Sequence, residues 1–413
     1  MKKIWPGLFL LASCQASADS LSDMIAAGKA DLQLRPRYEF VQQDGKPNNA
    51  NAYTLRTLLG YSLKPEAGFG GTIQFINVSA LGAEHFNSTL NGHTAYPVVA
   101  DPGVSAVNQA FLSYGGMPRT NLKLGRQIII LDNSRWIGNV DFRQNMQTFD
   151  AFSIENSSLK NTKFFVSRIA RVKGSYANFQ SPVGYNLQHV KADILHASFT
   201  PFKQTTLTAY EYFYQDESFP QGSPSNISSA TPGLRVDGSI GEGLRILYTA
   251  EYAKQRGYAG GHSGMDARYE LIGGGAAYGK LYARLDYETL GSNSTGTYGL
   301  QTPLATKHIF NGWADMFLMT PGKGLKDLFA TLGGKAGPLD MVAMVHDYRA
   351  DFDSTHYGSE WDLSASHAFT SHLSGSLIYA DYRAKDGAGA FFPGTAAPNV
   401  NTKKMWLTLL YRY

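Results

Sequence analysis

The chain ends with Met405-Trp406-Leu407-Thr408-Leu409-Leu410-Tyr411-Arg412-Tyr413, and this stretch decides the fold class. Met405, Leu407, Leu409, Tyr411 and Tyr413 occupy every second position. In an extended strand such residues share one face, whereas in a helix they would be spread around the axis. The period of two therefore predicts that the chain ends in a β-strand with one apolar face.

The same period recurs along the chain. Near the N-terminus the apolar residues are Leu32, Leu34, Pro36, Tyr38 and Phe40, and the polar residues between them are Gln33, Arg35, Arg37 and Glu39. Similar stretches run from 53 to 61, from 244 to 252 and from 281 to 287. Because Pro36 cannot donate a ladder hydrogen bond, we expect a bulge or a distortion there. A chain built from such strands is all-β.

The sense of the alternation separates a membrane barrel from a soluble sandwich, whose outer face would carry many lysines. Here the polar faces carry Arg with Asp or Glu, and the apolar faces carry Tyr and Phe near strand ends, as in a barrel with lipid outside and a polar lumen. The terminal aromatic resembles the signal by which outer-membrane barrels are recognised, so we expect the barrel-assembly machinery to bind Tyr413. Past the N-terminus, no apolar run reaches the length of a membrane helix.

The connections between strands provide a second test. Read in order, the strands number about eighteen, each of roughly ten residues, although weak alternation near 70–84 and 325–335 would also allow about sixteen. Short connections alternate with long ones; the short ones lie at 64–70, 115–121, 156–160, 200–203, 238–243, 278–280, 335–338 and 369–372, and the long ones include 85–103, 128–144, 173–189, 216–232, 290–325 and 385–401. This order predicts a transmembrane antiparallel up-and-down β-barrel with short periplasmic turns and long extracellular loops.

The N-terminus indicates secretion. Lys2 and Lys3 precede an apolar run, and Ala16-Ser17-Ala18 is typical of a cleavage site. We therefore expect residues 1–18 to be a signal peptide and residues 19–413 to be one barrel domain in the outer membrane. The alternative is that Leu11-Ala12-Ser13-Cys14 is a lipoprotein box, in which case Cys14 would carry a lipid anchor. The formal net charge of +4 falls to +2 without the two lysines, and we expect no nucleic-acid partner.

Two stretches carry a resemblance to a known family. The first runs from Leu124-Gly125-Arg126-Gln127 through Asp132, Arg135, Gly138 and Phe142-Arg143-Gln144-Asn145 to Thr148-Phe149-Asp150, and the second is Gln301–Asp315. Both resemble the alginate-export porin family. The resemblance implies an outer-membrane barrel of about eighteen strands that passes an acidic polysaccharide through an arginine-lined lumen. Many members of that family resemble general or oligosaccharide porins.

Arginine suits this task because its guanidinium binds carboxylates in a planar fork and stays charged. Neighbouring acids would keep each contact weak enough for release. The candidate pore-lining residues are Arg35, Arg37, Glu39, Arg56, Arg126, Asp132, Arg135, Arg143, Asp150, Arg168, Arg245, Glu251, Arg284, Asp286 and Glu288. The alternative is that these groups only neutralise one another within the wall. Arg126 does not share the parity of a lumen residue relative to Leu122 and Leu124, so either a bulge intervenes or it faces elsewhere.

The leading hypothesis is a channel for hydrophilic, anionic or neutral saccharides, with outer-membrane lipid and lipopolysaccharide as its surroundings. A general porin, and a structural or adhesion barrel with a plugged lumen, remain alternatives. The loop at 128–144 could fold into the barrel as a constriction or lie outside as a flap. A hydrolase would need a serine beside His346, His356 or His367, and no strand presents such a set. We expect no catalytic residue, no metal site and no cofactor.

Overall fold

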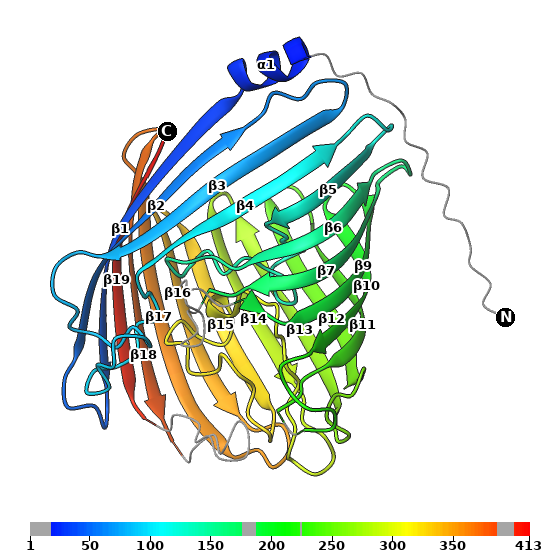
Figure 1. The fold of residues 1–413 in the computed structure, drawn as a ribbon. Coiled ribbons are helices and arrows are strands. Elements are labelled where there is room, and N and C mark those ends of the chain that lie inside the picture. Colours follow the sequence, from blue (N-terminus) through cyan, green and yellow to red (C-terminus); the bar gives the residue numbers. More distant parts are fainter. Residues whose placement is uncertain (1–17, 176–186, 224, 386–399) are drawn as a thin grey trace.

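The computed structural model describes residues 18–175, 187–223, 225–385 and 400–413. Nineteen strands form one sheet, and since β8 has only 2 residues, eighteen long strands remain in this part of the chain (Figure 1). The strands are β1 (Lys29–Gln43), β2 (Ala50–Ser62), β3 (Phe69–Ala80), β4 (Val104–Tyr114), β5 (Thr120–Gln127), β6 (Thr148–Asn156), β7 (Thr162–Lys173), β8 (Leu187–Gln188), β9 (Val190–Phe202), β10 (Thr205–Asp216), β11 (Ser229–Ile240), β12 (Leu244–Gly257), β13 (Asp266–Tyr278), β14 (Leu281–Leu290), β15 (Leu325–Ala336), β16 (Leu339–Arg349), β17 (His356–Ala368), β18 (Leu373–Ala384) and β19 (Thr402–Arg412).

The sheet is a closed barrel. Neighbours in the chain pair antiparallel, and β1 pairs with both β2 and β19, so the first and last strands meet. The all-β prediction and the count of about eighteen long strands are therefore confirmed. Closure leaves no strand edge exposed, which a sheet in lipid requires.

The period of two separates the two faces of the wall. In β19, Leu407 is 53% exposed and Tyr413, which follows the strand, is 76% exposed, whereas Trp406 is fully buried. Apolar side chains exposed on the outside of a barrel contact lipid, and their neighbours point into the lumen. The apolar band predicted from the C-terminal stretch is thus on the outer face.

A bulge or a distortion was predicted at Pro36; there is no bulge, but the pairing with β19 is interrupted. The pairing of β1 with β2 runs through Pro36 without a shift in register. On the other side, the pairing with β19 skips Arg35 and Pro36 and resumes at Arg37 in the same register. Proline has no N–H to donate to β19, so the wall loses hydrogen bonds at this place without changing its geometry.

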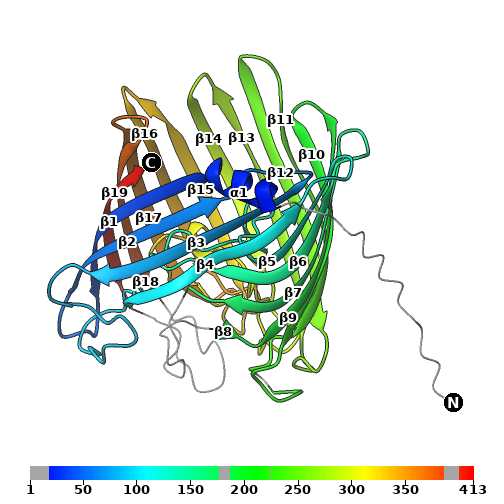
Figure 2. The ribbon, with the colours of Figure 1, turned by 45° about the horizontal axis from the view of Figure 1, so that its top comes forward.

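One end of the barrel carries the short turns, the C-terminus and a short helix, α1 (Ala18–Ala26), which the sequence patterns did not predict (Figures 1 and 2). The Lys64 amide donates to the Met24 carbonyl and joins α1 to the turn after β2. Short turns and both ends of the barrel domain mark the periplasmic side. Apart from Ala18, the predicted signal peptide and Cys14 lie outside the described residues.

Two connections fill part of the interior of the barrel. The connections at 128–147 and 291–324 fold inward, and their residues Trp136, Ile137, Leu300 and Leu304 join one hydrophobic cluster with inward residues of the wall. The core of this molecule therefore lies between two loops and the inner face of the sheet. The loop predicted at 128–144 folds into the barrel and is not an external flap.

Candidate functional site

Trp136 anchors the loop at 128–147 to the inner face of the strands from β10 to β15, which we call the far wall. The indole ring lies 5.7 Å from the ring of Tyr210 and 5.2 Å from that of Tyr269, measured between centroids. Its Nε1 donates a hydrogen bond of 2.7 Å to Glu251 Oε1. Trp136 has only 8% of its surface exposed, so it is an anchor for the middle of the loop.

The inner face of β1 and β2, which we call the near wall, holds the same loop by its backbone. Arg35 donates from Nη1 to the carbonyl of Asp141 at 2.7 Å and from Nη2 to that of Arg143 at 2.6 Å. Arg37 donates from Nη1 to the carbonyl of Phe142 at 2.6 Å. Three successive carbonyls of an irregular segment would otherwise lack partners in the lumen. Two of the predicted pore-lining arginines therefore also hold the loop in place.

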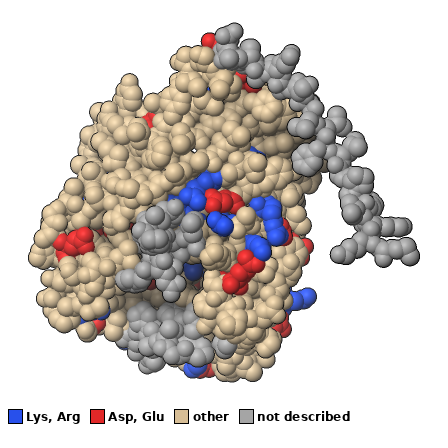
Figure 3. Space-filling view, viewed as in Figure 1, with Lys and Arg blue, Asp and Glu red and all other residues tan. Residues whose placement is uncertain are grey.

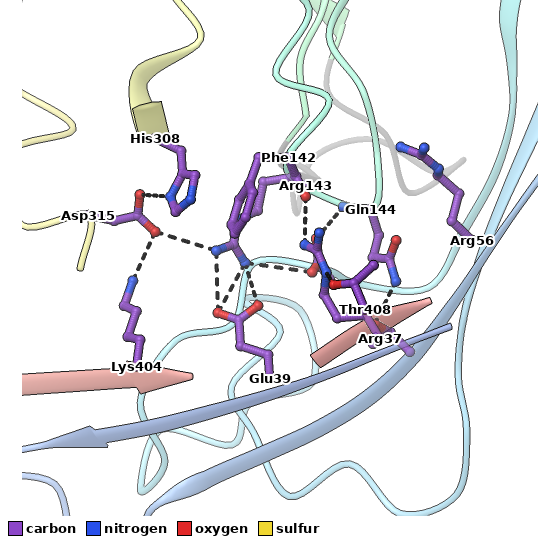
Figure 4. A network of polar contacts seen from close by, with 12 residues as sticks. Arg37, Glu39, Arg56, Phe142, Arg143, Gln144, His308, Asp315, Lys404 and Thr408 are labelled. Atoms are coloured by element: carbon purple, nitrogen blue, oxygen red, sulfur yellow. Dashed lines mark hydrogen bonds and ion pairs between the residues drawn. The ribbon is translucent and has the colours of Figure 1, made fainter. Parts of the chain in front are cut away.

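Arg143 enters a network of buried charges (Figure 4). Its guanidinium lies 3.0 Å from Glu39 Oε2, 3.6 Å from Asp101 Oδ2 and 3.4 Å from Asp315 Oδ2. All four side chains have at most 7% of their surface exposed. Asp315 belongs to the second loop and also pairs with Lys404 of β19 at 2.9 Å. Arg143 thereby joins β1, both inserted loops and the connection that precedes β4.

The state of Asp315 follows from its neighbours. Burial alone would raise the pKa of this carboxyl, but Lys404, His308 and Arg143 together hold that pKa well below its ordinary value. Asp315 therefore stays ionised at neutral pH. Burial lowers the pKa of His308 by more than the nearby Asp315 carboxylate, 2.7 Å from its Nδ1, raises it, so this histidine is neutral at pH 7.

Arg135 forms a second anchor on the far wall. Its Nε lies 2.9 Å from Glu288 Oε1, and its Nη2 donates to Asn311 Oδ1 at 3.0 Å. Asn311 in turn donates to Glu288 Oε2 at 2.7 Å and to Asp327 Oδ2 at 3.1 Å. Burial alone would lower the pKa of Arg135, but the Glu288 carboxylate raises it above the ordinary value. This network attaches both loops to β14 and β15.

The two loops are bonded to each other. The Gly138 amide donates to the Leu304 carbonyl at 2.9 Å, and the Val140 amide donates to Thr306 Oγ1 at 3.0 Å. Gln147 Nε2 donates to the Leu304 carbonyl at 3.1 Å. Residues 128–147 and 291–324 therefore form one partition across the lumen, which we call the constriction.

Cavities lie between the constriction and the periplasmic turns. One cavity of about 760 Å³ extends from Gln204 and Ser239 at the turns to Asn133 and Asn311 in the loops. Another, of about 500 Å³, is lined by Arg35, Arg37, Asp141, Phe142, Thr408 and residues at the periplasmic ends of β17 and β18. Cavities of this size that contain several charged and polar side chains can hold a small hydrophilic solute.

Most predicted site residues do lie inside the barrel or in the constriction: Arg35, Arg37, Glu39, Arg56, Asp132, Arg135, Arg143, Arg245, Glu251, Arg284, Asp286 and Glu288. Many of them neutralise one another. Arg284 Nη2 lies 2.6 Å from Asp286 Oδ1, and Glu251 lies 2.8 Å from Arg235 Nη1. The structure therefore favours mutual pairing for these groups, whereas Arg245 has no ion pair within the described part of the chain.

Four residues that matter here are not among the predicted pore-lining residues: Trp136, Asp141, Arg235 and Asp315. Arg235 follows Leu234, which is 66% exposed, so strand parity could have placed it on the inner face. The other three sit in loops without a period. Their partners lie far away in the sequence, and no local pattern indicates them.

Arg126, Asp150 and Arg168 were predicted to line the pore, and this prediction is wrong. The pairing of β5 runs through Arg126 without a register shift, so Arg126 shares the outer face with Leu124, which is 61% exposed. Arg126 Nε lies 2.7 Å from Asp150 Oδ1 on the same face. Arg168 is paired across strands with Phe152 and Asp193 and alternates with the buried Ser167 and Ile169.

The physical reason is the position of these residues along the wall. Arg126, Asp150, Arg168 and Asp193 lie toward the extracellular ends of β5, β6, β7 and β9, and the outward positions nearer the periplasm carry apolar residues such as Leu124, Phe152, Val166 and Leu195. Figure 3 shows basic and acidic side chains gathered on this outer face. A charged residue in a strand therefore predicts a lumen-facing side chain only in the part of the strand that crosses the apolar band.

This placement gives a first prediction. Replacing Arg168 by Gln together with Asp193 by Asn should leave the ion selectivity of the channel unchanged, because the pair faces outward and is partly exposed. The cost in stability should be about 1 kcal/mol or less, as for an exposed ion pair. The reversal potential across a bilayer in a salt gradient is the measurement. A clear shift would place Arg168 in the ion path and contradict the assignment.

Two features are absent from the described part of the chain. No helix there is both long and apolar enough to span a membrane. No group of three or more His, Cys, Asp or Glu residues there is arranged to hold a metal ion.

Comparisons with known proteins agree with the architecture. A model of the alginate export family matches residues 30–290, more than half of the chain. The structure of Pseudomonas aeruginosa OpdK with vanillate is similar at a TM-score of 0.70 and 13% identity, over 94% of this chain and 99% of that chain. Acinetobacter baumannii OccAB4 gives 0.70 and 13%, over 94% and 98%. A comparison with curated proteins finds no match. At these identities the solved structures establish the fold.

Proposed function

We propose that this chain, which belongs to the alginate export family of outer-membrane porins, passes small anionic saccharides. The family and the fold make it a β-barrel channel of the bacterial outer membrane. The solutes that we propose are uronate oligosaccharides of the alginate type, since the cavities beside the constriction measure a few hundred cubic ångströms.

One observation carries the proposal. Arg35, Arg37 and Arg56 lie on adjacent strands of the near wall, and the one carboxylate in direct ion-pair contact with them among the described residues is that of Asp141. Glu39 and Asp101 are held by Arg143 instead. Beside the 500 Å³ cavity, three guanidiniums therefore stand against the one carboxylate that pairs with them, and Asp340, the other carboxylate of the lining, is neutralised by Lys335. In a narrow site of low dielectric, such an excess attracts anions.

The structural neighbours add a modest argument. OpdK was crystallised with vanillate, whose carboxylate is the same chemical group as that of a uronate. A barrel of the same architecture thus accommodates a small carboxylate. We extend this chemistry to the present chain only as support for an acidic solute.

Purified protein in a planar lipid bilayer tests the proposal. We expect the reversal potential in a potassium chloride gradient to show anion preference, and we expect uronate oligosaccharides added to the periplasmic side to interrupt the current more often than neutral ones of equal size. A channel that prefers cations and treats the two sugars alike would be a general porin. A barrel without measurable conductance would be a plugged, structural or adhesion barrel.

Arg245 provides a prediction on the field inside the barrel. It faces the periplasmic mouth and lines a cavity of about 470 Å³ with Lys280 and Lys335. Arg245→Glu should weaken anion preference, because it reverses one charge near the ion path without breaking an ion pair in the described structure. The reversal potential measures this. Arg349→Glu, on an exposed residue beside Asp347 at the other end of β16, is the control and should have a smaller effect.

An enzymatic role has less support. His346 lies between Asp327 at 2.9 Å and Asp362 at 3.6 Å, His356 contacts Asp347, and His367 contacts the Pro338 carbonyl. Among the described residues, none of these histidines has a hydrogen bond with a serine hydroxyl. A transport channel is the function that we propose, with lipopolysaccharide around the barrel and recognition of Tyr413 by the assembly machinery as further expectations.

A further inference from the structure

Arg35 and Arg56 stand directly opposite each other across β1 and β2. Both side chains face the lumen, with 7% and 1% of their surfaces exposed. Like charges in directly opposed positions repel each other, and burial increases this cost. A carboxylate beside the two guanidiniums is therefore needed, and Asp141 supplies it.

Asp141 is an incomplete partner for these two arginines. Its Oδ1 lies 2.6 Å from Arg56 Nη1 and 3.6 Å from Arg35 Nη1, and Oδ2 has no hydrogen bond within the described residues. Arg56 Nε is buried and also lacks a hydrogen-bond partner there. A guanidinium can bind both oxygens of a carboxylate in parallel, and this contact uses only one.

The Asp141 carboxylate is also more accessible than a structural partner would be. Its side chain is 45% exposed, although the arginines behind it are almost fully buried. It lines the 500 Å³ cavity, which reaches the periplasmic ends of β17 and β18. A solute that enters this cavity meets the Asp141 carboxylate first and the Arg35 guanidinium next to it.

The backbone at this position does not depend on the carboxylate. Arg35 holds the carbonyls of Asp141 and Arg143, and Arg37 holds that of Phe142. Gln144 adds a hydrogen bond of 2.9 Å from Arg35 Nε to its Oε1. The Asp141 side chain can therefore turn away by rotation about its own bonds while the loop stays in place.

We propose that Arg35 and Arg56 form a carboxylate-binding subsite, which Asp141 covers and which accepts the carboxylate of an acidic sugar when the Asp141 side chain turns away. The exchange replaces one carboxylate by another, so the charge beside the buried arginines is conserved. This inference rests on the proposed function and adds the residue that competes with the solute. Asp141 then sets the affinity: it prevents a tight complex that would block the channel.

Single-channel recording with glucuronate on the periplasmic side tests the subsite. Asp141→Asn keeps the size of the side chain and removes its charge, so the glucuronate concentration that halves the current should fall about tenfold. Vanillate should behave like glucuronate, and uncharged glucose should not respond to the substitution. Asp340→Asn is the matched control, because Asp340 lines the same cavity but pairs with Lys335.

A second variant separates the outcomes. Arg56→Gln in the Asp141→Asn background should return the half-blocking concentration of glucuronate toward or above that of the original protein. If glucuronate blocks the original protein and Asp141→Asn with equal potency, the subsite is refuted although the proposed function stands. If the original protein shows neither glucuronate block nor anion preference, the proposed function fails and the subsite with it. Circular dichroism and resistance to denaturation in detergent verify that each variant is a folded barrel.

Discussion

Arg143→Ala is expected to raise the single-channel conductance several-fold. The substitution leaves Glu39, Asp101 and Asp315 close together without the guanidinium that holds all three. Removing one partner from a buried ion pair costs about 3–5 kcal/mol, because the remaining charge is not compensated. The wall does not need this network for its own hydrogen bonds, so we expect the constriction to loosen around Glu39 while the barrel stays closed and Arg35 and Arg37 still bind the loop backbone.

The control for this prediction is Arg383→Ala. Arg383 also pairs with a carboxylate, that of Asp381, but its own side chain is 51% exposed. Its loss should change the conductance little. A conductance of Arg143→Ala equal to that of the original protein would mean that the buried network does not hold the constriction.

Trp136→Ala should have the second largest effect. Removing a buried tryptophan costs about 3–5 kcal/mol through lost contacts and the cavity that remains. Here the loss also leaves Glu251 with one donor fewer, although Tyr210 and Arg235 still bind it. We expect the middle of the loop to leave the far wall, so that trypsin cuts after Arg135 or Arg143 in folded protein.

Limited proteolysis in detergent, followed by mass spectrometry, measures this release. Trp136→Phe keeps an aromatic ring against Tyr269 but loses the hydrogen bond to Glu251, and it should be cut at an intermediate rate. Cleavage at equal rates in all three proteins would show that Trp136 is not an anchor.

The sequence was sufficient for the wall and insufficient for the interior. Two-residue periodicity places Leu407 outside and Trp406 inside because it is a local property of an extended chain. The strand count is predicted by the connections, because short periplasmic turns alternate with long extracellular loops in such a barrel. Strand parity alone therefore places residues such as Arg35 and Glu39 in the lumen.

The constriction depends on contacts that no local pattern contains. Arg143 meets Glu39 and Asp315, which are separated from it by more than a hundred positions in each direction. The sequence could not decide between an inserted loop and an external flap, since both would be polar. The prediction for the outward charges was wrong for a different reason: Arg168 lies on the outer face beyond the extracellular edge of the apolar band, where charged side chains are also tolerated.

Pro36 has a consequence for how the molecule comes apart. It lies in β1, where the first strand meets the last, and it withholds an amide hydrogen from β19. This contact joins β1 and β19, the two paired strands that are synthesised furthest apart in time. A missing rung at that junction makes the two strands easier to separate than a complete ladder would.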